Sequence, residues 1–381
     1  MNDSVLLITT ISLIIIASPF LAKLFRLPIT PVEIILGSIF GYVGLIHSEH
    51  LFDIVAEFGF LYLMFIAGTE INLKNVLKIP VSLMKKIVLY LVILYGLSLF
   101  ISFNLNFSNI FIVLLPLISV GLVASLSKEY GKQEWINLSM TAGGIGEVVS
   151  IVLLTITSSA LVSGFGIGLV ESIVALSLFL VFMFVLFRLM QLVFWWFPEV
   201  STALMPYKDN KEQDIRLSMG IFFLLIATMI YLDLELAFGA FLAGIFIPSF
   251  FEHKKELPEK LASFGFGFLI PVFFVHIGYT FNLEALAMDG LIQEAIIIAL
   301  AIIFMRVVAS SVFFSEVSKI EAILVGLSHS MPLTLLIAMA TLAYNANSID
   351  TLHYYAFILA AIFQVIFVMI AIRIFNTKLS L

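Results

Sequence analysis

The stretch TAGGIGEVVSIVLLTI, residues 141–156, carries one charged side chain, Glu147, in an otherwise apolar run. No other ionisable side chain occurs between Glu134 and Glu171. A run of this kind is typical of a helix that spans a membrane, where an ionised and unpaired carboxylate is costly. Glu147 is therefore expected to have either a partner or a function.

The whole chain shares this apolar character. Of its 381 residues, 62% are hydrophobic and only 12% are charged, and the mean hydropathy is +1.17. Water-soluble domains do not reach such values, so the composition predicts an integral membrane protein. The absence of cysteine excludes disulfides, thiolate metal sites and a cysteine nucleophile.

Apolar runs of about 20 residues, separated by short polar segments, recur along the chain. Thirteen such runs predict thirteen membrane-spanning helices and hence an all-α fold. Their approximate limits are 4–22, 31–46, 52–72, 80–103, 108–127, 136–160, 165–190, 214–232, 235–250, 261–281, 291–314, 319–344 and 352–376.

The basic residues test this count, because cytoplasmic loops of membrane proteins are enriched in Lys and Arg. With thirteen spans, 18 of the 19 basic residues fall on one side of the membrane, and only Arg306 lies in the middle of a span. The 18 residues are Lys23, Arg26, Lys74, Lys78, Lys85, Lys86, Lys128, Lys132, Arg188, Lys208, Lys211, Arg216, Lys254, Lys255, Lys260, Lys319, Arg373 and Lys378. The sequence thus predicts a multi-pass protein of the cytoplasmic membrane, with its N-terminus outside and its C-terminus in the cytoplasm.

The number of spans also predicts an internal repeat. Six spans, a linking span at 165–190 and six further spans suggest two repeats of opposite orientation, as in secondary transporters. The longest loop, roughly 191–213, is too short for a domain. We therefore expect a single transmembrane unit without a soluble regulatory domain.

Glu147 and Arg306 are expected at the same depth. Glu147 lies about 11 residues from the start of its span, or about 17 Å along a helix, near the middle of a ~30 Å hydrocarbon core. Arg306 is equally isolated, with no other charge between Glu294 and Glu316. A paired Arg stabilises the carboxylate, whereas burial favours the neutral acid, so the two residues together predict a group that exchanges a proton for a cation. The alternative is an ion pair that only fixes helix packing.

Two other spans carry proline and small polar residues at their centres. LLPLISVGLVASLSKEYG, residues 114–131, contains Pro116, Ser119 and Gly121, and GLSHSMPLTLL, residues 326–336, contains Ser328, His329, Ser330 and Pro332. Proline frees backbone carbonyls that can bind a cation. Because the two segments occupy equivalent places in the two halves, they predict helices broken at a substrate site. For either segment alone, an ordinary proline kink is the alternative.

The remaining polar residues give weaker signals. His276 and His329 can titrate or bind a cation, although a single His in a membrane helix is more often a packing residue. Four carboxylates near span ends are interpreted as interfacial or helix-capping; they are Glu33, Glu57, Glu70 and Glu171. Sequence motifs of metalloproteases, phosphate-binding loops and dinucleotide-binding folds are missing, which argues against an enzyme.

Four segments in order resemble the monovalent cation/proton antiporters of the second cation/proton antiporter group, which includes bacterial sodium/proton and glutathione-gated potassium/proton exchangers. They are FRLPITPVEIILGSIFGYVGL (25–45), VAEFGFLYLMFIAGTEINL (55–73), ELAFGAFLAGIFIPS (235–249) and IPVFFVHIGYTFNL (270–283). The resemblance covers almost the whole chain. It implies a dimerisation domain, 1–79 and 214–281, and a mobile core domain, 80–160 and 291–377.

By resemblance, the two broken helices cross at the ion site and Glu147 takes the place of the carboxylate that carries the proton and the cation. Arg306 takes the place of the family's basic residue, and Ser119 would supply a further ligand. Two positions depart from the family pattern: Gly146 stands where the family has an acidic or amide residue, and Val120 where it has Thr.

These features predict a secondary antiporter that exchanges Na⁺ or K⁺ for H⁺ by alternating access, electroneutrally because one midplane acid serves both ions. Two alternatives stay open: an organic-anion symporter in which Arg306 contacts the anion, and a transport-inactive membrane sensor. The expected partners are the cation, the proton, the lipid bilayer and a second copy of the chain. No cofactor, no nucleic acid and no metal beyond the transported cation is expected.

Overall fold

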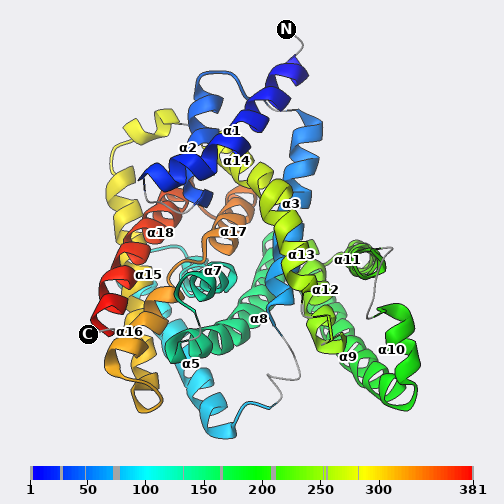
Figure 1. The fold of residues 1–381 in the computed structure, drawn as a ribbon. Coiled ribbons are helices and arrows are strands. Elements are labelled where there is room, and N and C mark those ends of the chain that lie inside the picture. Colours follow the sequence, from blue (N-terminus) through cyan, green and yellow to red (C-terminus); the bar gives the residue numbers. More distant parts are fainter. Residues whose placement is uncertain are drawn as a thin grey trace. The chain divides into compact units, whose positions relative to one another are not determined.

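The structure, a computed structural model, describes residues 3–25, 29–47, 49–71, 78–131, 133–163, 166–206, 212–251, 253–254, 256–281 and 283–379. Within these residues the chain forms helices and no strand (Figure 1). The predicted all-α fold class is confirmed.

Each predicted span coincides, within the described residues, with one helix or with consecutive helices. Ten spans correspond to α1 (Asp3–Phe25), α2 (Ile29–Tyr42), α3 (His50–Thr69), α5 (Val81–Asn104), α8 (Glu134–Ser163), α9 (Ile167–Trp196), α11 (Gln213–Tyr231), α12 (Leu236–Phe250), α15 (Leu291–Ala309) and α18 (Thr351–Leu379). Another is continuous through α13 (Leu257–Phe264), a π-helix (Gly265–Leu269) and α14 (Ile270–Thr280). Among the helices described, nine are long and apolar enough to cross a membrane.

The two spans predicted to be broken are interrupted in the structure. α6 (Phe111–Leu114) is separated from α7 (Gly121–Tyr130) by residues 115–120, which we call the first break. α16 (Lys319–Ser328) is separated from α17 (Leu333–Asn345) by residues 329–332, the second break. Each break contains a proline, Pro116 or Pro332, which cannot supply the N–H that a helix interior needs.

Three short elements were not predicted. They are α10 (Pro198–Leu204), the π-helix at Gly265–Leu269 and a 3₁₀ turn at Leu283–Ala287; the span predicted at 291–314 continues beyond α15 as a 3₁₀ turn at Ser310–Ser315. Several basic residues that support the predicted sidedness lie outside the described residues: Arg26, Lys74, Lys132, Lys208, Lys211 and Lys255, together with the side chains of Lys128 and Lys378.

Contacts divide the chain into two compact units. The first comprises residues 1–59, 80–150 and 268–381, and the second comprises residues 60–79 and 151–267. In the first unit, α2 packs along α14 and α15 packs along α18.

The α2–α14 contact depends on glycines. A Cβ atom at Gly278 would lie 2.0 Å from the carbonyl oxygen of Ile34, and one at Gly37 would lie 2.3 Å from that of Val275. The Ser38 hydroxyl donates to the Gly278 carbonyl at 2.8 Å. Small residues of this kind let two backbones touch, as is common between membrane helices.

The second unit contains the same kind of contact between α3 and α12. A Cβ atom at Gly244 would lie 2.0 Å from the carbonyl oxygen of Phe65, and one at Gly68 would lie 2.1 Å from that of Phe241. Each contact joins a helix from the first six spans to one from the last six. In two six-span repeats, the second span is equivalent to the ninth and the third to the tenth, so the two contacts join equivalent pairs of helices. The segments GTEINL (68–73) and GYTFNL (278–283) also share sequence letters. These equivalences fit two six-helix repeats joined by α9.

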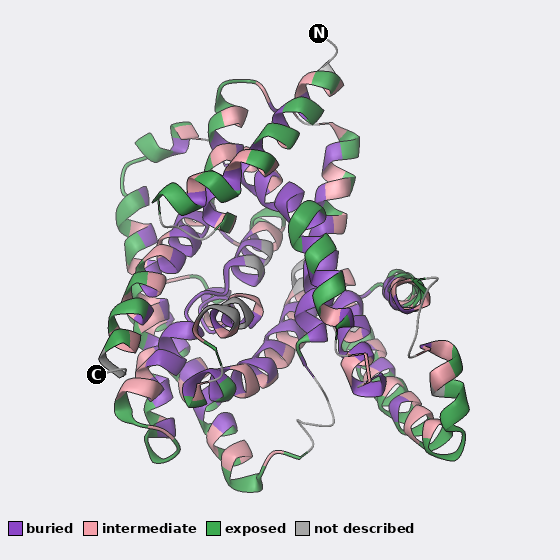
Figure 2. Cartoon of the chain, viewed as in Figure 1, coloured by how far each residue is buried: buried purple, intermediate pink, exposed green. Residues whose placement is uncertain are grey.

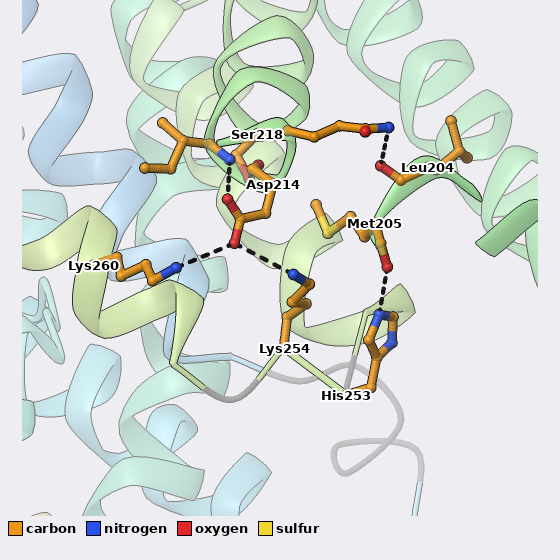
Figure 3. A network of polar contacts seen from close by, with 9 residues as sticks. Leu204, Met205, Asp214, Ser218, His253, Lys254 and Lys260 are labelled. Atoms are coloured by element: carbon orange, nitrogen blue, oxygen red, sulfur yellow. Dashed lines mark hydrogen bonds and ion pairs between the residues drawn. The ribbon is translucent and has the colours of Figure 1, made fainter. Parts of the chain in front are cut away.

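A polar network ties together the start of α11 and the segment before α13 in the second unit (Figure 3). Asp214 is 1% exposed, and its Oδ2 lies 3.6 Å from the Nζ atoms of both Lys254 and Lys260. His253 Nε2 donates to the carbonyl of Met205 at 2.9 Å. Sequence analysis did not single out Asp214, since it lies among other charged residues at the end of a span.

Candidate functional site

The first break is held by side chains of α8. The N–H of Val120 donates to Glu147 Oε2 at 3.1 Å, and the Ser119 hydroxyl donates to Glu147 Oε1 at 3.1 Å. The N–H of Ile118 donates to Ser150 Oγ at 2.9 Å. Backbone groups that an unbroken helix would pair internally are thus satisfied by a neighbouring helix.

The carboxylate of Glu147 lies at the N-terminus of a helix. Its side chain is 0% exposed, and Val120, whose N–H it accepts, is the residue that precedes α7. The N-terminus of a helix favours a negative charge there. Two accepted hydrogen bonds leave lone pairs on the carboxylate oxygens, so the group can take up a proton or a cation.

Arg306 contacts the other side of the same break. Its Nη2 donates to the carbonyl of Leu117, and its Nη1 donates to the carbonyl of Ile302 at 3.1 Å on its own helix. Among the described residues, Arg306 makes no ion pair with Glu147. The expected direct pairing of these two charges is therefore wrong for this structure, because the guanidinium instead caps a carbonyl that the break has freed.

Ser328, the last residue of α16, and His329, the first residue of the second break, contact the first half of α8. Ser328 Oγ lies 2.9 Å from Ser139 Oγ, and His329 Nε2 lies 2.9 Å from the Ser139 carbonyl oxygen. Ser330 Oγ donates to the carbonyl of Gly326 at 2.8 Å, within its own chain segment. These three side chains are buried but form no hydrogen bond with Glu147 among the described residues.

Both breaks therefore contact one face of α8. Ser139, Gly143, Glu147 and Ser150 recur at intervals of four, four and three residues, which places them on one side of a helix. Figure 2 shows α8 buried or half-buried over most of its length. Sequence reasoning missed Ser139 and Ser150, although this spacing of small and polar residues was a readable signal.

The glycines on this face admit the side chains of the breaks. A Cβ atom at Gly143 would lie 2.7 Å from Val120 Cγ1 and 2.9 Å from His329 Nε2. One at Gly146 would lie 2.6 Å from Ile118 Cδ1. Ile118 thus fills the space that a side chain at position 146 would need.

Two other predicted residues lie apart from this site. His276 Nε2 is 3.0 Å from Asp53 Oδ1, and neither residue hydrogen-bonds to Glu147. Glu33 is only 4% exposed and accepts a hydrogen bond from Ser18 Oγ at 3.3 Å. Glu33 is therefore buried against α1, which carries Ser18.

The described residues contain no group of three or more His, Cys, Asp or Glu side chains that could hold a metal ion. The site at the first break consists instead of one carboxylate, one hydroxyl and backbone groups. Such a site suits a monovalent ion or a proton.

Comparison with known proteins identifies the family. The family model described as the transmembrane part of sodium/hydrogen exchangers matches residues 8–376. The chain belongs to the sodium/hydrogen exchanger family. The resemblance noted in the sequence is thereby confirmed at the level of this family.

Curated members of the exchanger family are similar over most of this chain. A putative Na⁺/H⁺ antiporter YjbQ of Bacillus subtilis is 26% identical over 98% of this chain and 63% of its own length. A probable Na⁺/H⁺ antiporter 3 of Methanocaldococcus jannaschii is 24% identical over 72% of this chain and 70% of its own length. This exchanger-family chain thus spans about 63% of the Bacillus subtilis relative.

A solved structure shares the fold. The sodium proton antiporter MjNhaP1 of Methanocaldococcus jannaschii, solved at pH 8, superimposes with a TM-score of 0.65 over 97% of each chain, at 15% sequence identity. This exchanger-family chain therefore has the same fold as that solved structure.

Proposed function

We propose that the protein is a secondary antiporter that exchanges a monovalent cation, Na⁺ or K⁺, for H⁺ by alternating access. Glu147 binds either the cation or the proton, and competition between them for one carboxylate couples the two flows. With a single carboxylate at the site, one proton moves per cation and exchange is electroneutral.

The observation that carries the proposal is the environment of Glu147. The carboxylate is fully buried, lies at the interruption of a membrane helix and accepts hydrogen bonds from Ser119 and Val120. It lacks an ion-pair partner among the described residues, so its charge can be balanced by a transported ion. An isolated acid in this position marks an ion pathway more often than a packing contact.

The names of the relatives support Na⁺ as a substrate. The Bacillus cereus protein GerT, 27% identical over 73% of this chain and 73% of its own length, is described as a probable Na⁺/H⁺ antiporter. Arg306 weighs against the organic-anion alternative, because its Nη atoms donate to backbone carbonyls. A transport-inactive sensor would bind an ion without carrying it.

Purified protein in liposomes with a pH-sensitive dye inside tests these readings together. Addition of Na⁺, Li⁺ or K⁺ outside is expected to release protons from the liposome interior in the parent protein and not in Glu147→Gln. Glu147→Gln transport equal to the parent's contradicts the assignment. A membrane current that depends on cation and pH contradicts electroneutrality, and uptake of an organic anion that Arg306→Lys abolishes favours the symporter.

We further propose the membrane arrangement that the sequence predicts. The N-terminus lies outside the cytoplasmic membrane and the C-terminus in the cytoplasm. Residues 1–79 and 214–281 form the dimerisation domain, and residues 80–160 and 291–377 the core domain. Chemical crosslinking in native membranes tests the dimer, and labelling of single cysteines introduced into the cysteine-free chain tests the sidedness.

A further inference from the structure

His329 connects three helices through one imidazole ring. It opens the second break, directly after α16, and is fully buried. Its Nδ1 lies 3.0 Å from the hydroxyl of Tyr90 on α5, and its Nε2 lies 2.9 Å from the carbonyl oxygen of Ser139 on α8. Tyr90 is fully buried as well, with its ring centroid 5.6 Å from that of His329.

These contacts determine the tautomer of the neutral ring. A carbonyl oxygen only accepts hydrogen bonds, so Nε2 must carry the hydrogen that points at Ser139. Nδ1 is then the acceptor, and the Tyr90 hydroxyl donates to it. Both ring nitrogens are occupied, which leaves His329 no lone pair for a cation in this arrangement.

The ring lies where the second break touches α8 most closely. A Cβ atom at Gly143 would be 2.9 Å from His329 Nε2, so only glycine leaves room for the ring at that position. Ser328 Oγ adds a second contact, 2.9 Å from Ser139 Oγ. Glu147 follows Gly143 by four residues, about 6 Å further along the same helix. If the second break moves at His329, it therefore shifts α8 one turn away from the proposed ion-binding carboxylate.

We propose that His329 is a positioning residue, which holds the second break against α8 through its two ring nitrogens and so fixes Glu147 for the ion. Tyr90 sets the orientation of the ring. His329 does not itself bind the cation. The proposal rests on the proposed function, because it assigns His329 a role at the site of Glu147.

Transport kinetics in proteoliposomes give the first test. His329→Ala removes both hydrogen bonds and leaves the buried Tyr90 hydroxyl without the acceptor that His329 supplies, so the cation KM is expected to rise about tenfold, with a smaller fall in Vmax. His329→Gln keeps an N–H that reaches the Ser139 carbonyl and is expected to stay within about threefold of the parent KM. The cation KM of Tyr90→Phe is expected to lie between those of His329→Ala and His329→Gln. Tyr231→Phe, which alters a tyrosine that is 88% exposed, serves as the control.

Two kinetic outcomes overturn the proposal. One is a parental KM in His329→Ala. The other is a His329→Gln variant as impaired as His329→Ala, with a pH profile shifted in both, since the imidazole would then act directly in binding or proton transfer.

A crosslinking assay supplies a second readout that does not need transport. The chain has no cysteine, so Ser139→Cys with Ser328→Cys introduces one pair whose parent hydroxyl oxygens are 2.9 Å apart. This pair is expected to form a disulfide under mild oxidation, more slowly with His329→Ala added and at the original rate with His329→Gln added. Equal rates in all three backgrounds, each monodisperse on gel filtration, overturn the positioning role. If no variant moves any cation, the proposed function fails while the crosslinking result still decides the role of His329.

Discussion

Glu147 Oε2 accepts a hydrogen bond from the backbone N–H of Val120, 3.1 Å away, at the residue that precedes α7. The carboxylate is thereby stabilised by the N-terminus of a helix and not by a positively charged side chain. A cation that binds it must approach the positive end of a helix dipole, which weakens binding and favours release. The proposed exchange cycle needs such reversible binding.

The proposed competition at Glu147 predicts that transport depends on pH in a defined direction. As the pH falls, protons occupy more of the carboxylate, so the apparent KM for Na⁺ is expected to rise while Vmax at saturating Na⁺ changes little. Proton-flux assays at a series of pH values measure both parameters. A KM that is independent of pH would show that the proton and the cation bind at different groups.

Glu147→Gln is expected to abolish exchange without unfolding the protein. The amide oxygen still accepts the N–H of Val120, so Tm in detergent should stay within a few degrees of the parent's. The amide can neither bind a cation strongly nor release a proton, so flux should fall to the level of empty liposomes. Thermal unfolding and flux on the same preparation separate loss of function from loss of fold.

Arg306→Met is expected to destabilise the protein, because it removes the donor to the Leu117 carbonyl in the first break. An unpaired buried carbonyl costs about 1–3 kcal/mol, which should appear as a lower Tm. Arg306→Lys keeps a charged donor, so its Tm should lie between those of Arg306→Met and the parent. Arg373→Lys, at an exposed position, is the matched control. An Arg306→Met variant as stable as the parent would contradict the role of Arg306 in capping the Leu117 carbonyl.

Gly146→Ala is expected to impair both stability and transport, since its Cβ would lie 2.6 Å from Ile118 Cδ1. Ile118→Val removes that methyl group and should restore part of the loss in the double variant. The two single variants and the double variant form a cycle measured by Tm and by flux. Additive effects would mean that the two side chains do not meet.

Gly278→Ala should be among the most harmful changes outside the site. Its Cβ would lie 2.0 Å from the carbonyl oxygen of Ile34, a backbone atom that cannot rotate away. We expect a loss of roughly 3 kcal/mol or failure to express. Gly96→Ala in α5 is the control, because nothing lies within 4 Å of its added Cβ. There we expect a small gain of stability from helix propensity.

Asp214→Asn is expected to lower the stability of the second unit by about 1–3 kcal/mol, because Lys254 loses the buried charge that it faces. Glu256→Gln, at an exposed neighbouring position, is the control. Cation exchange at saturating substrate should be retained by both variants that fold. Equal Tm values for the parent and Asp214→Asn would mean that the network in Figure 3 contributes nothing to stability.

The sequence by itself determined the elements of this protein. A helix in a membrane must satisfy its backbone internally and expose apolar side chains to lipid, so span limits and broken helices follow from local composition. For the same reason Glu147 and Arg306 were singled out, because a charged side chain in the middle of a span is unfavourable in lipid. The burial of Glu33 was not predicted, because a span end offers no local sign of whether another helix covers it.

Only the tertiary structure decided which groups meet. The sequence placed Glu147 and Arg306 at one depth and suggested that opposite charges pair, but each instead satisfies a different backbone group of the first break. That outcome depends on a carbonyl and an N–H that every residue possesses, and which of them a break leaves free cannot be read from side-chain identity. The contacts of His329 with Tyr90 and Ser139 likewise join residues 239 and 190 positions apart. Such pairings exist only once packing has brought distant segments of the chain together.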